Sequence, residues 1–223
     1  YRTMLDIDDL VLGILATAEA VTNERQRELG VAVVSIGGST TSCAIFEEEE
    51  LLTVGMFPIG SERITNDLAI GLRTSIDVAE RVKLSHGSAA PKTFGKNEVI
   101  DLAEFGADVS EKVSKKYIAE IIEARAEEIL ASVEKLMKKI GRVGMLPAGV
   151  LLTGGGAKLP GIVELTKDRL KLPAMIGYPL QVSAITDRAG DSAFTCAIGL
   201  VQWGARSLRD RKGGLQNFFS HFK

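Results

Sequence analysis

The chain has 223 residues, of which 45% are hydrophobic and 25% are charged, and its formal net charge is −2. This balance is typical of a soluble globular protein and argues against intrinsic disorder. The near-neutral charge offers no broadly basic surface, so we expect no nucleic-acid partner. Cys43 and Cys196 stand in apolar contexts, which favours buried thiols over a bridge and fits a reducing cytoplasm.

The N-terminal segment predicts a helix from Ile7 to Glu28 and contains no cleavable apolar signal. The chain begins with Tyr1 rather than methionine, so we expect it to be a fragment of a longer protein.

Three short β-branched or apolar runs predict a meander of strands around a glycine-rich loop. Val31 to Val34 leads into the loop, Cys43 to Phe46 leaves it, and Leu51 to Val54 follows an acidic turn. Glycine lets main-chain N–H groups come close to a phosphate. We therefore expect the loop to take phosphate or a metal-bound water through Gly37, Gly38, Ser39, Thr40 and Thr41.

A second glycine-rich loop follows the predicted strand from Gly149 to Leu152 and consists of Gly154, Gly155 and Gly156. A nucleotide base could lie against these glycines, and Pro160 suits the first turn of the next helix. Either loop alone is equally typical of a hairpin or a strand-to-helix link. Two such loops with a charged helix between them indicate half of an ATP cleft.

The segment between the loops predicts an inserted lobe, residues 61–144, of helices near 61–72 and 75–85, a strand near 98–102 and a helix near 114–140. Apolar residues recur every three or four positions in the last helix, which should pack on the sheet. Residues 1–60 and 145–207 would form a discontinuous core lobe. Its final helix would run from Ala193 to about Ser207, with Asp191 or Ser192 as the N-cap.

One continuous run of residues resembles the sequence of a particular protein family. Residues Phe57 to Thr74, continuing through Ala79 to Lys83 and Gly87 to Ala89, resemble the FtsA family of bacterial cell-division proteins along nearly the whole chain. The resemblance implies an α/β fold: the second domain of an actin-like (ribonuclease H-like) protein, with a mixed sheet and an inserted α+β lobe. It also implies ATP with Mg²⁺ as cofactors and a missing N-terminal half.

The resemblance gives roles to residues of the inserted lobe. Glu80 and Lys83 would contact the ribose and the adenine, with Gly60 and Asn66 nearby. The alternative for Glu80 and Lys83, three positions apart on one helix face, is an ordinary surface pair. Asn66 could simply belong to the first turn of a helix.

The chain departs from the family at two acidic positions, which here are Ser35 and Ser42. A carboxylate before the first loop helps to hold hydrated Mg²⁺ and to order the attacking water, and a hydroxyl does this poorly. We expect ATP binding to survive better than hydrolysis, which leaves at most a weak ATPase. The alternative is that groups in the absent half hold the metal.

In the family the inserted lobe receives the C-terminal tail of the tubulin-like division protein FtsZ. Arg125 stands among acids in the long predicted helix and could bind a carboxylate of that tail. The alternative is an intrahelical pair of Arg125 with Glu128.

The C-terminal residues predict a linker from Leu208 to Gly214 and a short amphipathic helix. Its stripe consists of Leu215, Phe218, Phe219 and Phe222, flanked by basic residues, and it resembles the membrane-targeting helix of the family. We expect attachment to an anionic cytoplasmic membrane surface. The alternatives are a helix that folds back on the core or a frayed end.

Together with these features, the resemblance implies a cell-division protein that binds ATP, forms actin-like filaments and tethers the FtsZ ring to the cytoplasmic membrane at the division site. A pilus-assembly scaffold of the same superfold is one alternative. A kinase-type phosphotransferase is another, but it would need a general-base carboxylate and a substrate pocket, to which we assign no residues, and it would have no reason to end in an aromatic amphipathic helix.

Overall fold

A five-stranded mixed sheet forms the centre of the protein. The structure is a computed structural model that describes residues 7, 9–95, 97–180 and 190–220, with side chains described to residue 207. The strands are β1 (Val31–Ile36), β2 (Thr41–Glu47), β3 (Glu50–Phe57), β6 (Gly149–Thr153) and β7 (Ala174–Ile176). Their order is β3-β2-β1-β6-β7, with β1 antiparallel to β2 and parallel to β6. The predicted meander and its shared sheet with the later strand are confirmed.

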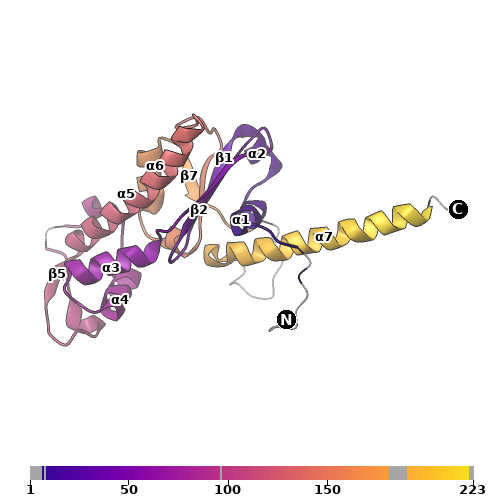
Figure 1. The fold of residues 1–223 in the computed structure, drawn as a ribbon. Helices are drawn as coiled ribbons and strands as arrows, with labels where there is room; N and C mark the ends of the chain where they lie inside the picture. The colour runs from indigo at the N-terminus through magenta and orange to yellow at the C-terminus, as the bar shows by residue number, and fades with distance from the viewer. Residues whose placement is uncertain (1–6, 8, 96, 181–189, 221–223) are drawn as a thin grey trace.

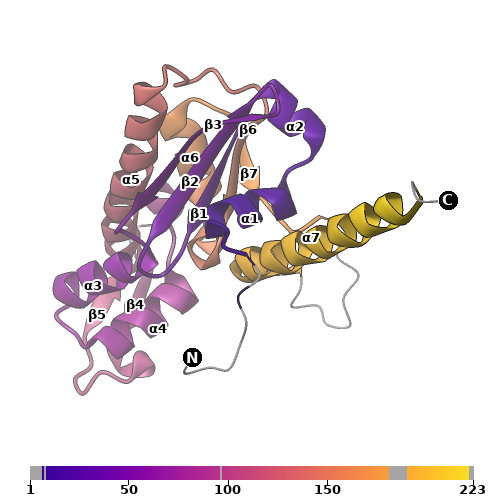
Figure 2. The ribbon, with the colours of Figure 1, turned by 45° about the vertical axis from the view of Figure 1, so that its right-hand side comes forward.

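Helices cover both faces of this sheet. The helices α5 (Lys115–Lys139) and α6 (Ile162–Leu170) lie on one side. On the other side lies α1 (Gly13–Val21), which packs against the start of α7 (Thr195–Ser220), as Figures 1 and 2 show. Alternate residues of β1 accordingly enter two apolar clusters, Val31 and Val33 on the α1 side and Ala32 and Val34 on the α5 side. Burial on both faces explains why β1 is almost wholly apolar.

The predicted inserted lobe contains α3 (Ser61–Gly71), α4 (Ile76–His86), and a small antiparallel hairpin of β4 (Val99–Asp101) and β5 (Lys112–Ser114). Helix α5 begins beside α3 and ends against β3, where Leu136 meets Gly55. Its predicted apolar stripe is confirmed, because Ile118, Ile122, Ile129 and Val133 are all buried. One continuous apolar cluster therefore joins the lobe to the sheet, and the division into lobes stays a prediction.

The prediction of a single helix from Ile7 to Glu28 is wrong. The chain forms α1 and then a separate helix, α2 (Glu24–Leu29). Asn23 starts α2 with a capping box, in which its side chain accepts from the Gln26 N–H and the Gln26 side chain accepts from the Asn23 N–H. These reciprocal bonds satisfy main-chain donors that a continuous helix would have used internally.

The C-terminal segment also differs from expectation. Helix α7 is continuous to Ser220, so residues 208–214 are helical and form no linker. The two glycines there, Gly213 and Gly214, cost about 1 kcal/mol each in a helix, but good helix formers precede them. Leu215, Phe218 and Phe219 fall in α7 without described side chains, and Phe222 lies outside the described residues. The amphipathic face stays a prediction.

Short 3₁₀ turns lie at Pro91–Thr93, Leu102–Phe105, Gly155–Lys158 and Ser192–Phe194.

Both cysteines are free thiols. Burial raises the pKa of the Cys43 thiol to about 12, and Cys196 is half-buried. Within the described residues, no helix combines the length and the apolar character needed to cross a membrane.

Candidate functional site

The two glycine loops lie side by side at the carboxyl ends of neighbouring parallel strands. Ser35 of β1 is in register with Thr153 of β6, so both loops leave the same edge of the sheet. Gly154 has a φ of +84°, and a Cβ there would lie 2.4 Å from the Ile36 carbonyl oxygen. Only glycine fits this contact, which seats the second loop directly on the start of the first.

Hydrogen bonds join the end of β6 and the second loop to the 3₁₀ turn Ser192–Phe194 and to Thr195, the first residue of α7. The Gly154 N–H donates to the Ser192 carbonyl at 3.0 Å. The Thr153 hydroxyl donates to the Thr195 hydroxyl, and Thr195 donates to the same Ser192 carbonyl, each at 2.8 Å. Gly155 at the tip is exposed, and a Cβ there would meet no atom within 4 Å, so its surface is open to a flat group.

Helix α3 starts against the first loop. The N–H groups of Ser61 and Glu62 donate to the carbonyls of Gly37 and Gly38, both at 2.9 Å. A Cβ on Gly60 would lie 2.3 Å from the Gly38 oxygen, so a side chain there would separate the helix from the loop. Gly60 therefore lies against the first loop, and its predicted place near the ribose and adenine stays a prediction.

The hydroxyl residues of the first loop do different things. Thr41 is buried, and its hydroxyl donates to the Ile59 carbonyl at 2.8 Å, so it holds the turn before α3 instead of facing a ligand. Thr40 and Gly37 line a cavity of about 410 Å³. Ser39 is exposed and donates to the Glu62 carboxylate at 2.8 Å. Nothing in the sequence pointed to Glu62.

Ser35 and Ser42 line that same cavity. They are direct partners in the antiparallel register of β1 and β2, so their side chains lie on one face of the sheet. Of the residues described around this cavity, none is acidic. The described chain also contains no group of three His, Cys, Asp or Glu side chains placed to hold a metal ion. The cavity therefore offers hydroxyl groups but no charge that would offset a resident Mg²⁺.

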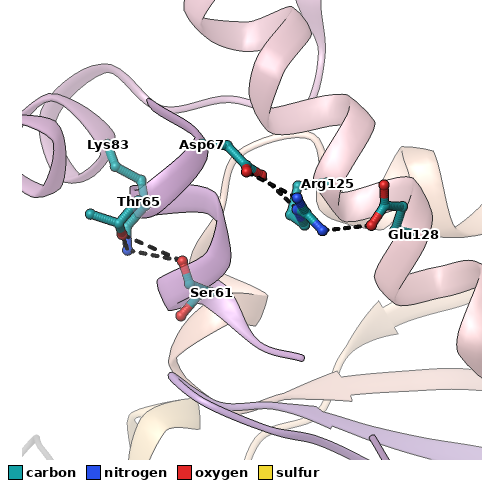
Figure 3. A network of polar contacts seen from close by, with 6 residues as sticks. All are labelled: Ser61, Thr65, Asp67, Lys83, Arg125 and Glu128. Carbon is teal, nitrogen blue, oxygen red and sulfur yellow. Dashed lines mark hydrogen bonds and ion pairs between the residues drawn. The ribbon is translucent and has the colours of Figure 1, made fainter. Parts of the chain in front are cut away.

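Glu80 and Lys83 form a network with Thr65, not an isolated surface pair. The Lys83 ammonium lies 2.7 Å from Glu80 and donates to the Thr65 hydroxyl at 2.8 Å, while Thr65 donates to Glu80 at 2.5 Å. Lys83 also reaches the Ser61 carbonyl at the start of α3, as Figure 3 shows. The Lys83 side chain is only 11% exposed, and that of Glu80 is 41% exposed.

The ionised form of Glu80 is stabilised in this network. Partial burial alone would raise the pKa of Glu80, but the hydrogen bonds from Lys83 and Thr65 and the charge of Lys83 outweigh it, so the pKa lies below its ordinary value. Asn66 is half-buried on α3, and its side chain makes no hydrogen bond with any described residue.

Arg125 sits on the opposite side of α3. Its guanidinium binds Asp67 of α3 through two nitrogens, at 2.5 and 2.9 Å, and Glu128 through the third at 2.6 Å (Figure 3). The charge of Asp67 raises the pKa of Arg125 through this hydrogen bonding. The expected alternative, the pair with Glu128, is present, and the sequence did not reveal the Asp67 pair. Arg125 braces α3 against α5.

Solved structures with this architecture define the class of the fold. MreB5 of Spiroplasma citri bound to ADP matches with a TM-score of 0.69 at 18% identity, over 90% of this chain and 60% of that one. The type IV pilus complex of PilM and PilN matches with 0.64 at 18% identity, over 88% and 53%. An archaeal actin homolog, Ta0583, also matches, with 0.56 at 15% identity, over 87% and 53%. The chain has the actin-like fold.

Sequence comparison narrows this class. The sequence model of the cell division protein FtsA matches residues 32–199. FtsA of Pseudomonas aeruginosa is 34% identical over 209 residues, which are 94% of this chain and 50% of that protein. FtsA of Neisseria meningitidis is 37% identical over an alignment of 225 positions that covers 96% of this chain and 54% of that protein. The chain belongs to the FtsA family and spans about half the length of these relatives.

Proposed function

We propose that this chain supplies half of an ATP-binding cleft in an FtsA-type division protein. The observation that carries the proposal is the meeting of two glycine loops at one edge of the sheet, with α3 seated on the first loop. Main-chain groups from Gly37 to Thr40 would take the phosphates. The adenine would lie against Gly154 to Gly156, and Glu80, Lys83 and Asn66 would bind the sugar and base. The MreB5 structure, which holds ADP in the same fold, supports this assignment.

The neutral pair of Ser35 and Ser42 supports binding with little hydrolysis. Two facing hydroxyls neither offset the charge of a hydrated Mg²⁺ nor polarise an attacking water as a carboxylate would. In a protein that carries both halves of the cleft, Ser35→Asp should raise the rate of phosphate release from ATP. An unchanged rate would mean that the missing carboxylate at position 35 is not what limits hydrolysis.

The binding residues are tested by a double substitution with a matched control. Glu80→Ala with Lys83→Ala should weaken the binding of a fluorescent ATP analogue at least about tenfold, because each good hydrogen bond to a charged group contributes about 1.5–3 kcal/mol. The control removes the exposed pair Lys116 and Glu120 of α5 in the same way. Equal affinity in both double variants would remove Glu80 and Lys83 from the site.

The family relationship supports a role as an adaptor at the division site. We propose that the protein self-assembles through its actin-like fold and that the inserted lobe binds the C-terminal tail of FtsZ at the seam of α3 and α5. Glu128 is 62% exposed, so a tail carboxylate could replace it on Arg125 while Asp67 stays in place. A tail peptide should lose affinity with Arg125→Glu and gain affinity with Glu128→Gln. No change in either variant would exclude Arg125 from the contact.

The C-terminal segment is proposed to attach the protein to the cytoplasmic face of the membrane. The predicted stripe of α7 would enter an anionic surface, and a filament would add many weak contacts together. Phe218→Glu with Phe219→Glu should abolish co-sedimentation with anionic vesicles. Gln216→Glu with Asn217→Glu adds the same charge beside the stripe and should weaken binding less. Equal pelleting of these variants would refute the anchor.

A further inference from the structure

A second cavity, here called the arginine cavity, lies between the end of α1, helix α2 and the first half of α7. Its volume is about 850 Å³, and it shares no lining residue with the cavity at the first glycine loop. Five charged side chains line it: Arg25, Arg27, Arg206, Glu19 and Glu24. Three guanidinium groups against two carboxylates leave an excess of positive charge. A cavity of this size can admit side chains of a partner, and its charge favours an acidic one.

The inner part of this lining is already neutralised within the chain. The Glu19 side chain is only 12% exposed, and it binds both Arg27, at 3.2 Å, and Arg206. Arg27 also donates to the Thr22 hydroxyl at 2.7 Å, and its guanidinium lies over the Phe46 ring. Arg27 is therefore fixed by contacts within the chain and is the least available of the three arginines.

The outer arginines are the ones that a partner can reach. Arg25 is exposed and forms no ion pair with any described residue. The Arg206 side chain is 67% exposed, and Glu19 is its one acidic partner in the described part of the chain. A carboxylate that enters between α2 and α7 would meet both guanidinium groups, each of which can donate two parallel hydrogen bonds to it.

The inserted lobe carries the opposite charge. Residues 98–111, here called the acidic tip, contain five acids and neither lysine nor arginine. Glu104, Asp108 and Glu111 are exposed, and none of them forms an ion pair with a described residue. Val109, which lies among them, is 73% exposed. The tip therefore presents carboxylates and an apolar side chain that the described part of the chain neither neutralises nor covers.

The acidic tip and the arginine cavity lie at opposite ends of the molecule. The tip belongs to the end that contains α4 and the hairpin of β4 and β5, whereas α2 lies at the other end (Figures 1 and 2). Arg81 of α4 lies beside Gly106 of the tip but forms no ion pair with its acids. Because the two surfaces face away from each other within one chain, they can meet only between copies.

We propose that the arginine cavity binds the acidic tip of a second copy of this chain, with Arg25 and Arg206 binding its carboxylates. Leu180, which lines the cavity and is 41% exposed, offers an apolar contact for Val109. Two different surfaces join in this contact, so it repeats head to tail and does not close as a two-fold dimer does. This inference rests on the proposed self-assembly and assigns the residues at which copies meet.

The test measures self-association of the full chain by sedimentation velocity. Arg25→Glu with Arg206→Gln should weaken it at least about tenfold, because like charges then face each other across the contact. Glu104→Lys with Asp108→Lys should weaken it to a similar extent from the other surface. Arg206→Gln leaves Glu19 paired with Arg27, and Arg25→Glu alone, which breaks no described contact, should produce part of the same loss.

Mixing the two double variants is the decisive measurement. Each fails alone because its tip and its cavity carry like charge, but together they offer complementary pairs and should associate to within about threefold of the wild type. Lys135→Glu with Lys167→Gln makes the same charge change at exposed lysines of α5 and α6 and should leave association unchanged.

Two results would overturn this inference while the proposed self-assembly stands. One is association that neither double variant weakens, and the other is loss in both variants without recovery on mixing. A wild-type chain that stays monomeric at every concentration would overturn the proposed self-assembly and this inference with it.

Discussion

Helix α3 lies between two charged networks that look alike in the sequence. On one side Glu80 and Lys83 of α4 engage Thr65, and on the other Arg125 and Glu128 of α5 engage Asp67 (Figure 3). Both pairs are spaced three apart on one helix. In each case the residue from α3 turns an ordinary intrahelical pair into a link between two helices.

The residue from α3, Thr65 in one network and Asp67 in the other, sets the net charge of each network. Thr65 contributes a neutral hydroxyl, so the Lys83 network has balanced charge and sits beside Gly60 and the first loop. Asp67 contributes a second carboxylate, so the Arg125 network has an excess of negative charge, and it lies away from the loop. The first network therefore lies where a ligand of the proposed cleft would meet it, whereas in the second network Asp67 braces α3 against α5 and the exposed Glu128 is the partner that a tail carboxylate could replace.

The largest loss of stability should come from displacing α3, the helix that contributes a residue to both networks. Gly60→Ala places a Cβ against the Gly38 oxygen and should push α3 off the first loop. We expect a loss of about 1–3 kcal/mol in the free energy of unfolding, as for other overpacked positions. Urea unfolding measures it. A stability equal to the wild type would show that the loop can move away without cost.

The Arg125 brace should show the next largest effect. Arg125→Met leaves Asp67 half-buried without its cation, and we expect a loss of about 1–2 kcal/mol after allowance for solvent. A double-mutant cycle with Asp67→Asn isolates the pair. A coupling energy near zero in that cycle would mean that the brace does not contribute to stability.

The contribution of the Glu80 network to the free energy of unfolding should depend on pH. Because the pKa of Glu80 in the folded protein lies below the ordinary 4.5, its ionised form stabilises the fold above that pH, and this contribution is lost as the pH falls. Glu80→Gln should therefore cost less than about 1 kcal/mol at neutral pH, and this cost should shrink as the pH falls below 4.5. In a Lys83→Met background this pH dependence should diminish. A pH-independent difference would contradict the assignment.

The smallest effect is expected at the outer end of the Arg125 network. Glu128→Gln removes an exposed partner three residues away and should cost only about 0.2–0.5 kcal/mol. Thermal unfolding at low and high salt separates this screened contribution from the Asp67 pair. A loss as large as that of Arg125→Met would mean that Glu128, and not Asp67, is the main partner.

Local patterns were sufficient to predict most of the fold. The apolar run of β1 reflects burial on both faces, and the stripe in α5 reflects burial on one face, so both patterns appear in the sequence. The short strand β7 was not predicted, because its three residues are defined by pairing with β6, not by any local pattern. The break between α1 and α2 did have a signal, since Asn23 and Gln26 have the spacing of a capping box.

The site was predicted less completely, for a geometric reason. Glycines and the pair of Glu80 and Lys83 are visible as local patterns. Glu62, Thr65 and Asp67 acquire their roles only because α3 packs between the first loop, α4 and α5. Thr65 and Asp67 are two residues apart, which places them on nearly opposite sides of a helix. No local pattern shows which neighbour each would meet.

The continuous helix α7 links the second glycine loop to a point far from the sheet. Its first residue, Thr195, is bonded to Thr153 at the end of β6, and the helix then continues to Ser220 without a break. At 1.5 Å per residue its 26 residues extend about 39 Å, so a tilt of about 5° at the loop displaces the far end by about 3 Å. If α7 moves as one rigid helix, a small rearrangement of the loop would reach a distant surface as a displacement, which a flexible linker would not transmit.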